Sequence, residues 1–289
     1  MPSRARLALL PLLLFLPACT VVHEDSSGTS TRVNLQGLYR DPGTGTTRPT
    51  RYCWAEVYDV NTGAVAADGY LDAQGQGTFT APAGAPLQVR IFARVEVPGT
   101  GADFTLRGSM KAASLPASFT SVASFNALED VNVTSSVGSG TSITLTAEPD
   151  AQQRAGAFNA VDQMVAFGQG VHTLEPGLKL PNLHGFYTSS GNTTSYPLLA
   201  VDGGGAPLKQ ASGRAVFALP VAGNATGGAS TNNDLGDDAV LLEAYSHLLL
   251  ADRSYPSDAS AAGTVIRRDN DDVWVDRDIQ SEPSVAFTD

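Results

Sequence analysis

Apolar and polar residues alternate along much of the first half of the chain, which predicts β-strands. In residues 87–97 every second residue, from Leu87 to Val97, is apolar, and those between are polar except for Phe92. A period of two places one set of side chains in a core and the other at the surface. Shorter runs of this kind, bounded by Asn, Asp and Gly turns, fill residues 33–148. Their number and spacing predict an antiparallel β-sandwich.

The hydrophobic period changes in the second half of the chain. Over residues 152–168 apolar residues recur every three or four positions, which predicts a helix that Asp150 can cap. Residues 237–252 predict a second helix, with Asp237 or Asp234 at its start. The expected fold class is therefore mainly β with an α+β second part, a sandwich followed by a small helix-containing domain. We place the boundary near Pro149, so that the second domain covers residues 149–289.

The first nineteen residues have the layout of a secretory signal. Two arginines precede the ten-residue apolar run Leu7–Leu16, which is too short to span a hydrocarbon core of about 30 Å. The run ends in LPAC, which resembles a bacterial lipobox. This resemblance implies removal of residues 1–18 and a lipid on Cys19, with residues 19–32 as a tether. The alternative is an ordinary signal peptide with a chance cysteine.

The resemblance also implies a place in the cell envelope. Acyl chains on Cys19 would hold the protein on a membrane surface. Thr20 stands where some lipoproteins carry the aspartate that retains them at the inner membrane, so we expect the outer membrane. The whole chain has a net charge of −11, and removal of Arg4 and Arg6 takes this to −13 (−11 − 2). Such an acidic chain argues against nucleic acid as a partner.

The two cysteines predict no disulfide framework. If Cys19 carries lipid, Cys53 has no partner in this chain. Cys53 begins the strand-like run CWAEVYDV, residues 53–60. We interpret it as a buried free thiol.

The middle of the first domain resembles the carboxypeptidase-regulatory, prealbumin-like domains of exported bacterial proteins. The resemblance rests on residues 55–93, with Asp72, Gly75 and Phe79 at the corner that those domains place between two strands. Domains of that family bind or brace other parts and carry no catalysis. The resemblance therefore implies a binding or scaffolding role, with an unidentified protein or peptide as partner.

The second helix carries the chain's candidate for metal chemistry. Glu243 and His247 are four residues apart and share one helix face. The stretch VLLEAYSHLL, residues 240–249, resembles the zinc-binding helix of gluzincin-type metallopeptidases. In that resemblance His247 takes the place of the second zinc-binding histidine and Glu243 that of the first. Ala244 replaces the glutamate that acts as general base.

The same resemblance supplies a third ligand. The gluzincin motif with the glutamate ligand is similar to SEPSVAF, residues 281–287, which places Glu282 in that role. Pro283 follows it and disfavours helical geometry at Glu282. The chain ends two residues after Phe287, so we expect a truncated form of the peptidase domain.

These observations leave two functions open. Without a general base at position 244, which contributes typically 10²–10⁴-fold, a zinc site made by Glu243, His247 and Glu282 should be slow or inactive. We therefore expect no cofactor and a non-catalytic, lipid-anchored binding or scaffolding protein with a degenerate peptidase-like domain. The alternative is a zinc-dependent metallopeptidase with a rewired site. In the first case Glu243 and His247 form an ordinary surface pair.

Overall fold

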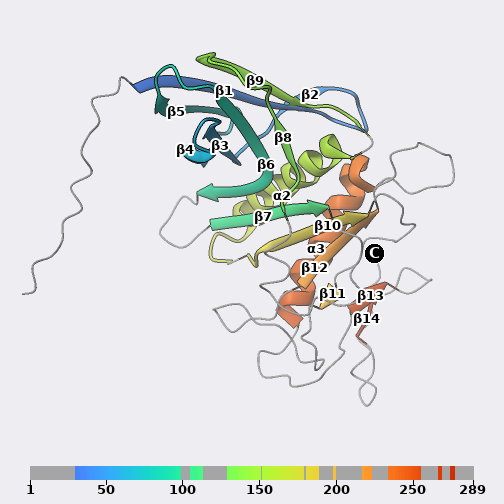
Figure 1. Cartoon of the computed structure of the whole chain (residues 1–289). Helices are drawn as coiled ribbons and strands as arrows, with labels where there is room; N and C mark the ends of the chain where they lie inside the picture. The colour runs from blue at the N-terminus through green and yellow to red at the C-terminus, as the bar shows by residue number, and fades with distance from the viewer. Residues whose placement is uncertain are drawn as a thin grey trace, which may run out of the picture.

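The described part of the chain forms two large β-sheets, a separate two-stranded hairpin and two long helices. The computed structural model describes residues 30–98, 105–112, 129–150, 152–178, 180–188, 198–199, 217–222, 234–254, 266–268 and 274–276. Figure 1 shows the smaller sheet at one end, the larger sheet running away from it, and the two helices along one side of the larger sheet.

The smaller sheet is organised around strand β1 (Ser30–Arg40). On one side β1 pairs antiparallel with two strands, β5 (Gln76–Pro82) and β2 (Thr47–Pro49). On the other side it pairs parallel with β9 (Ser142–Ala147). Alternate residues of β1 are buried, among them Val33, Leu35 and Tyr39, so one face of this sheet contributes to the core.

The larger sheet has eight strands. Their order is β11 (Leu198–Leu199), β12 (Phe217–Ala222), β10 (Leu183–Thr188), β7 (Thr105–Ala112), β6 (Leu87–Pro98), β3 (Cys53–Asp59) and β4 (Ala64–Tyr70). The eighth strand, β8 (Asn132–Thr134), also pairs with β6. Strand β10 is parallel to both of its neighbours, and the other pairs are antiparallel. A separate hairpin joins β13 (Ile266–Arg268) to β14 (Trp274–Asp276).

Both predicted helices are present. Helix α2 (Arg154–Leu174) runs beyond the predicted end at residue 168. Asp150 Oδ1 accepts hydrogen bonds from the backbone N–H groups of residues 152 and 154, although the N-cap position itself is Gln153. Helix α3 (Asp238–Ser254) follows the short 3₁₀ helix η1 (Asp234–Gly236). Asp237 Oδ1 accepts from the backbone N–H groups of residues 239 and 240, which confirms Asp237 as the cap.

One continuous core joins these layers. At the β3 and β6 end, the inner face of the larger sheet packs on the smaller sheet, and at the β7 and β10 end it packs on α2 and α3. The approach of α2 to β7 is close: a Cβ on Gly108 would lie 2.5 Å from Met164 Sδ. Glycine at 108 therefore lets the helix lie directly on the sheet.

The predicted fold class, mainly β with an α+β part, is confirmed, although the sheets are mixed where alternation predicted antiparallel pairing. The predicted face of β6 is also confirmed, because its alternate residues from Leu87 to Val97 are all buried. Cys53 is buried and makes no disulfide within the described residues. The predicted domain boundary near Pro149 lies between β9 and α2, and the larger sheet contains strands from both sides of it; the division stays a prediction.

Candidate functional site

Helix α3 turns one stripe of side chains into the core against α2. Leu241, Ala244, Tyr245 and Leu248 recur at three and four residues, and each is at most 2% exposed. The Tyr245 hydroxyl donates a hydrogen bond of 2.9 Å to the backbone carbonyl of Ala160, and burial raises the pKa of this phenol. Position 244, which the peptidase resemblance assigns to the general base, therefore faces the packed interior.

The predicted metal ligands are only partly described. Glu243 and His247 lie on α3 outside the buried stripe, and each is partly exposed. Glu282 lies outside the described residues, as does the predicted lipidation site Cys19. Among the residues that are described, no group of three or more His, Cys, Asp or Glu side chains could hold a metal ion. The ligand set Glu243, His247 and Glu282 stays a prediction.

A second group of polar residues is buried between β1 and α2. The Tyr39 hydroxyl donates to Asp162 Oδ2 at 3.0 Å, and Arg51 Nε lies 2.5 Å from Asp162 Oδ1. Asn159 Nδ2 donates to the backbone carbonyl of Leu235, which precedes α3. Burial, followed by the charge of Asp162, raises the pKa of Tyr39. These contacts tie the first strand to both helices, and we assign them a structural role.

The outer face of the larger sheet carries a different kind of surface. Arg94 of β6 is directly opposite Ser109 of β7, and Ser109 is directly opposite His184 of β10. We call these three residues the outer rung. Their immediate chain neighbours Val95, Gly108 and Leu183 pair in the same way and point to the core, because side chains alternate between the two faces of a sheet.

A cavity of about 220 Å³ opens over the outer rung, and we call it the charged hollow. It is lined by the outer rung together with Tyr70, Val95, Arg107, Gly108, Lys111, Asp130 and Asn182. Two of its cations are paired: Lys111 Nζ lies 2.7 Å from Asp130 Oδ1, and Arg107 Nε lies 3.1 Å from Glu96 Oε2. The guanidinium of Arg94 instead lies 4.4 Å from the centroid of the Trp54 ring. This arrangement suits the binding of an anion.

Among the described residues of the charged hollow, His184 has the side chain that most often serves as a general base. Burial, followed by the charge of Lys111, lowers the pKa of His184 to about 4. A general base works best when its pKa lies near the operating pH, so this imidazole is neutral and weakly basic at pH 7. The lowered pKa therefore makes His184 a poor general base at neutral pH.

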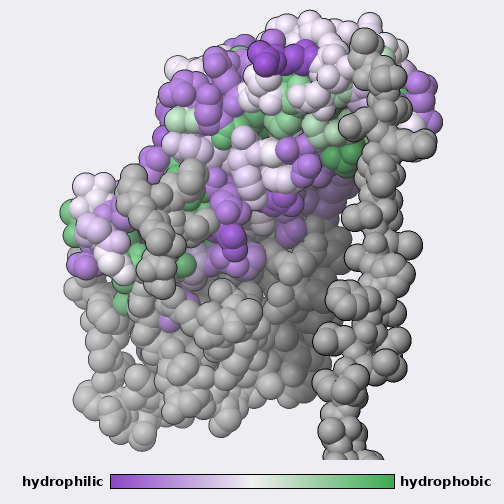
Figure 2. Space-filling model, turned by 90° about the vertical axis from the view of Figure 1, so that its left-hand side faces the viewer, coloured by the Kyte–Doolittle hydropathy of each residue, from purple (hydrophilic) through white to green (hydrophobic). Residues whose placement is uncertain are grey.

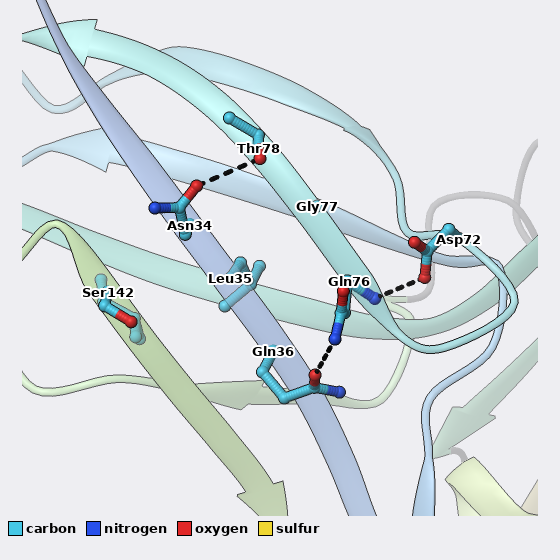
Figure 3. A pocket seen from close by; sticks show the side chains of 9 residues that line it. Asn34, Leu35, Gln36, Asp72, Gln76, Gly77, Thr78 and Ser142 are labelled. Carbon is cyan, nitrogen blue, oxygen red and sulfur yellow. Dashed lines mark hydrogen bonds between the residues drawn. The ribbon is translucent and has the colours of Figure 1, made fainter.

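A larger, shallower cavity of about 560 Å³ lies on the outer face of the smaller sheet (Figure 3). Its polar side chains bond largely to one another: Thr78 Oγ1 donates to Asn34 Oδ1 at 3.2 Å, and Gln76 Nε2 donates to Gln36 Oε1 at 3.0 Å. Asp72 is the one charged residue among the described residues that line it, and Asp72 Oδ1 accepts from the backbone N–H groups of residues 74 and 76. With much of its hydrogen bonding already satisfied internally, this surface is the weaker candidate.

Few large hydrophobic side chains are exposed on the described surface. Figure 2 shows mainly hydrophilic and neutral residues on the face that it draws, with hydrophobic atoms in small groups between them. The large hydrophobic residues that are exposed among those described are Val60, Val65, Tyr70, Val137 and Leu174. The described helices include none that is long and apolar enough to cross a membrane.

Comparisons with known proteins assign no family to this chain. No protein-family model matches the sequence, and no curated protein matches it. Among solved structures, a 9R-lipoxygenase from Cyanothece PCC8801 matches with a TM-score of 0.21 and 12% identity, over 51% of this chain and 25% of that chain. The matched part thus spans about a quarter of the lipoxygenase, and similarity this low supports no inference about fold or function.

Proposed function

We propose that this protein is an exported lipoprotein of the cell envelope whose β-rich body binds a small ligand without transforming it. The observation that carries the proposal is the charged hollow over the outer rung. It offers donors and positive charge around a cavity, and the one histidine among its described lining residues is a weak base at neutral pH. Concave sites with a few convergent polar groups are the usual form of ligand sites.

The burial of Ala244 supports the non-catalytic part of the proposal. In a gluzincin-type site the general base must reach a metal-bound water. Ala244 is 2% exposed and lies in the stripe of α3 that packs on α2. No proton acceptor at this position would face solvent, so a peptidase reaction would need both a different base and a different geometry.

The LPAC motif supports the lipid anchor. If Cys19 is the acylated first residue, only ten residues, 20–29, separate it from β1. At no more than about 3.6 Å per residue this tether reaches at most roughly 36 Å. The folded body would therefore work close to a membrane surface.

The experiment has two arms, one for the anchor and one for the absence of catalysis. Mass spectrometry of the purified mature protein should show Cys19 as an acylated N-terminus, and Cys19→Ala should be released from the membrane fraction. Zinc analysis and peptide hydrolysis should give the same low values for the native protein and for Glu243→Ala/His247→Ala. An unmodified Cys19 overturns the anchor, and zinc-dependent hydrolysis that the double variant loses overturns the binding role in favour of a peptidase.

A further inference from the structure

We propose that the charged hollow recognises a small hydroxylated monocarboxylate, of the size of a sugar acid, and that Arg94 supplies the positive charge that pairs with its carboxylate. This inference deepens the proposed function and rests on it, because it names the ligand class of the proposed binding site.

The charges around the hollow leave room for one negative charge. Arg107 is paired with Glu96, and Lys111 with Asp130. Arg94 makes no ion pair within the described part of the chain, and its buried Nε has no hydrogen-bond acceptor there. His184 is neutral at pH 7. Among the described residues the local excess is therefore one positive charge, in a chain whose overall charge is −11, and this matches a monocarboxylate better than a phosphate dianion.

Two aromatic rings restrict the position of the Arg94 guanidinium before a ligand binds. It lies over the Trp54 ring at 4.4 Å and also near the Tyr70 ring, 6.0 Å from its centroid. The two rings contact each other edge to face, with centroids 4.8 Å apart. Stacking of this kind restricts the side chain before a ligand arrives, so less entropy is lost when it binds. A planar guanidinium fork is also the group that best matches a carboxylate.

Ser109 places a small side chain between Arg94 and His184 in the hollow. Arg94 and His184 stand two strand spacings apart, about 10 Å between backbones, and Ser109 lies between them on β7. The volume of about 220 Å³ is smaller than the roughly 300–1,000 Å³ of drug-sized sites, so the ligand is small.

The remaining lining groups suit hydroxyl groups of a ligand. Asn182 and Ser109 offer uncharged donors and acceptors at the same cavity. Tyr70 also lines the hollow, and burial raises the pKa of its phenol, which is therefore protonated at pH 7. A carboxylate beside Arg94 and hydroxyl groups beside these residues together describe a sugar acid.

The test is calorimetric titration of the purified full-length protein with glucuronate, with glucose and inorganic phosphate as the two comparison solutes. Native protein should bind glucuronate, and glucose, which lacks the carboxylate, should bind at least tenfold more weakly. Arg94→Gln should weaken glucuronate binding by about 10- to 100-fold, the loss expected for one charge-assisted hydrogen-bonding group. Arg94→Lys should retain part of the affinity.

The matched control is Arg90→Gln. Arg90 lies on the same strand and the same face, stacked at 4.6 Å on the ring of Tyr58, but it does not line the hollow. Its removal should leave glucuronate affinity within about twofold. Thermal unfolding, followed by circular dichroism, identifies any variant that does not fold. If Arg94→Gln does not fold, the glucuronate affinity of Arg94→Lys is compared with that of the native protein instead.

The outcomes separate this inference from the proposed function. Equal affinity for glucuronate in native protein and Arg94→Gln, or no glucuronate binding at all, overturns the ligand class. If phosphate or glucose binds more tightly than glucuronate and Ser109→Val abolishes that binding, the ligand class is overturned while the binding function stands. Zinc-dependent peptide hydrolysis overturns the binding function itself.

Discussion

Neighbouring residues of strands β6, β7 and β10 lie in different surroundings, because one face of the sheet packs in the core and the other lines a cavity. On the inner face Val95, Gly108 and Leu183 pair across the strands and pack beneath α2. One residue along each strand, the outer rung presents a guanidinium, a hydroxyl and an imidazole to a cavity. The packed face and the proposed recognition face are thus separated by a single step along the backbone, and substitutions on the two faces should affect different measurements.

The largest effect is expected on the inner side, where α3 packs on α2. Tyr245→Ala removes a ring that is fully buried and should lower the free energy of unfolding by about 3–5 kcal/mol. Tyr245→Phe keeps the ring and loses only the hydrogen bond to the carbonyl of Ala160, so it should cost about 1 kcal/mol. Urea unfolding of both variants measures the difference. Equal losses would show that the ring is not packed as described.

Residues 108 and 109 test the difference between the two faces of the sheet most directly, because they are adjacent in the chain and lie on opposite faces. Gly108→Val places a side chain against Met164 and should destabilise the protein by about 1–3 kcal/mol. Ser109→Val points into the charged hollow instead; it should change stability by about 1 kcal/mol or less and weaken glucuronate binding at least tenfold. Unfolding and titration of the pair test this. A Ser109→Val protein that binds normally would mean that the hollow is not the site.

A smaller effect is expected from the pH dependence of stability. The folded pKa of His184, about 4, lies below the unfolded value of about 6.5. Between these pH values the unfolded chain binds a proton that folded His184 does not, so the free energy of unfolding falls as the pH is lowered through this window. The expected loss is about 1–3 kcal/mol.

The control for this effect is His184→Asn, which cannot bind the proton. Its stability should fall less than that of the native protein between pH 6.5 and 4, and the two curves should run parallel above pH 7. Identical curves throughout the acid range would show that His184 titrates at an ordinary pKa.

The sequence predicted the elements better than the way in which they assemble. Alternation along residues 87–97 identified the buried face of β6, and three- and four-residue spacing with Asp150 and Asp237 identified both helices. These features are local, so a single chain segment contains them. The parallel pairing of β10 with β7 joins residues more than 70 positions apart, and no local period encodes it.

The candidate site was missed for the same reason. Arg94 was visible as an outward residue of its strand, but Ser109 and His184 come next to it only through the pairing of three strands. Lys111 and Asp130 meet across a single bridge outside the main ladder. By contrast, Glu243 and His247 drew notice because their spacing is helical. Two such side chains four residues apart occur on many helices that bind no ligand.

The most direct test sets the two candidate sites against each other in one titration series. Glucuronate binding is measured for native protein, Ser109→Val and Glu243→Ala/His247→Ala, with folding verified for each. We predict that the α3 double variant binds within about twofold of the native protein and that Ser109→Val binds at least tenfold more weakly. The reverse result, in which binding is lost with the α3 pair and kept in Ser109→Val, would contradict the placement of the site on the outer face of the sheet.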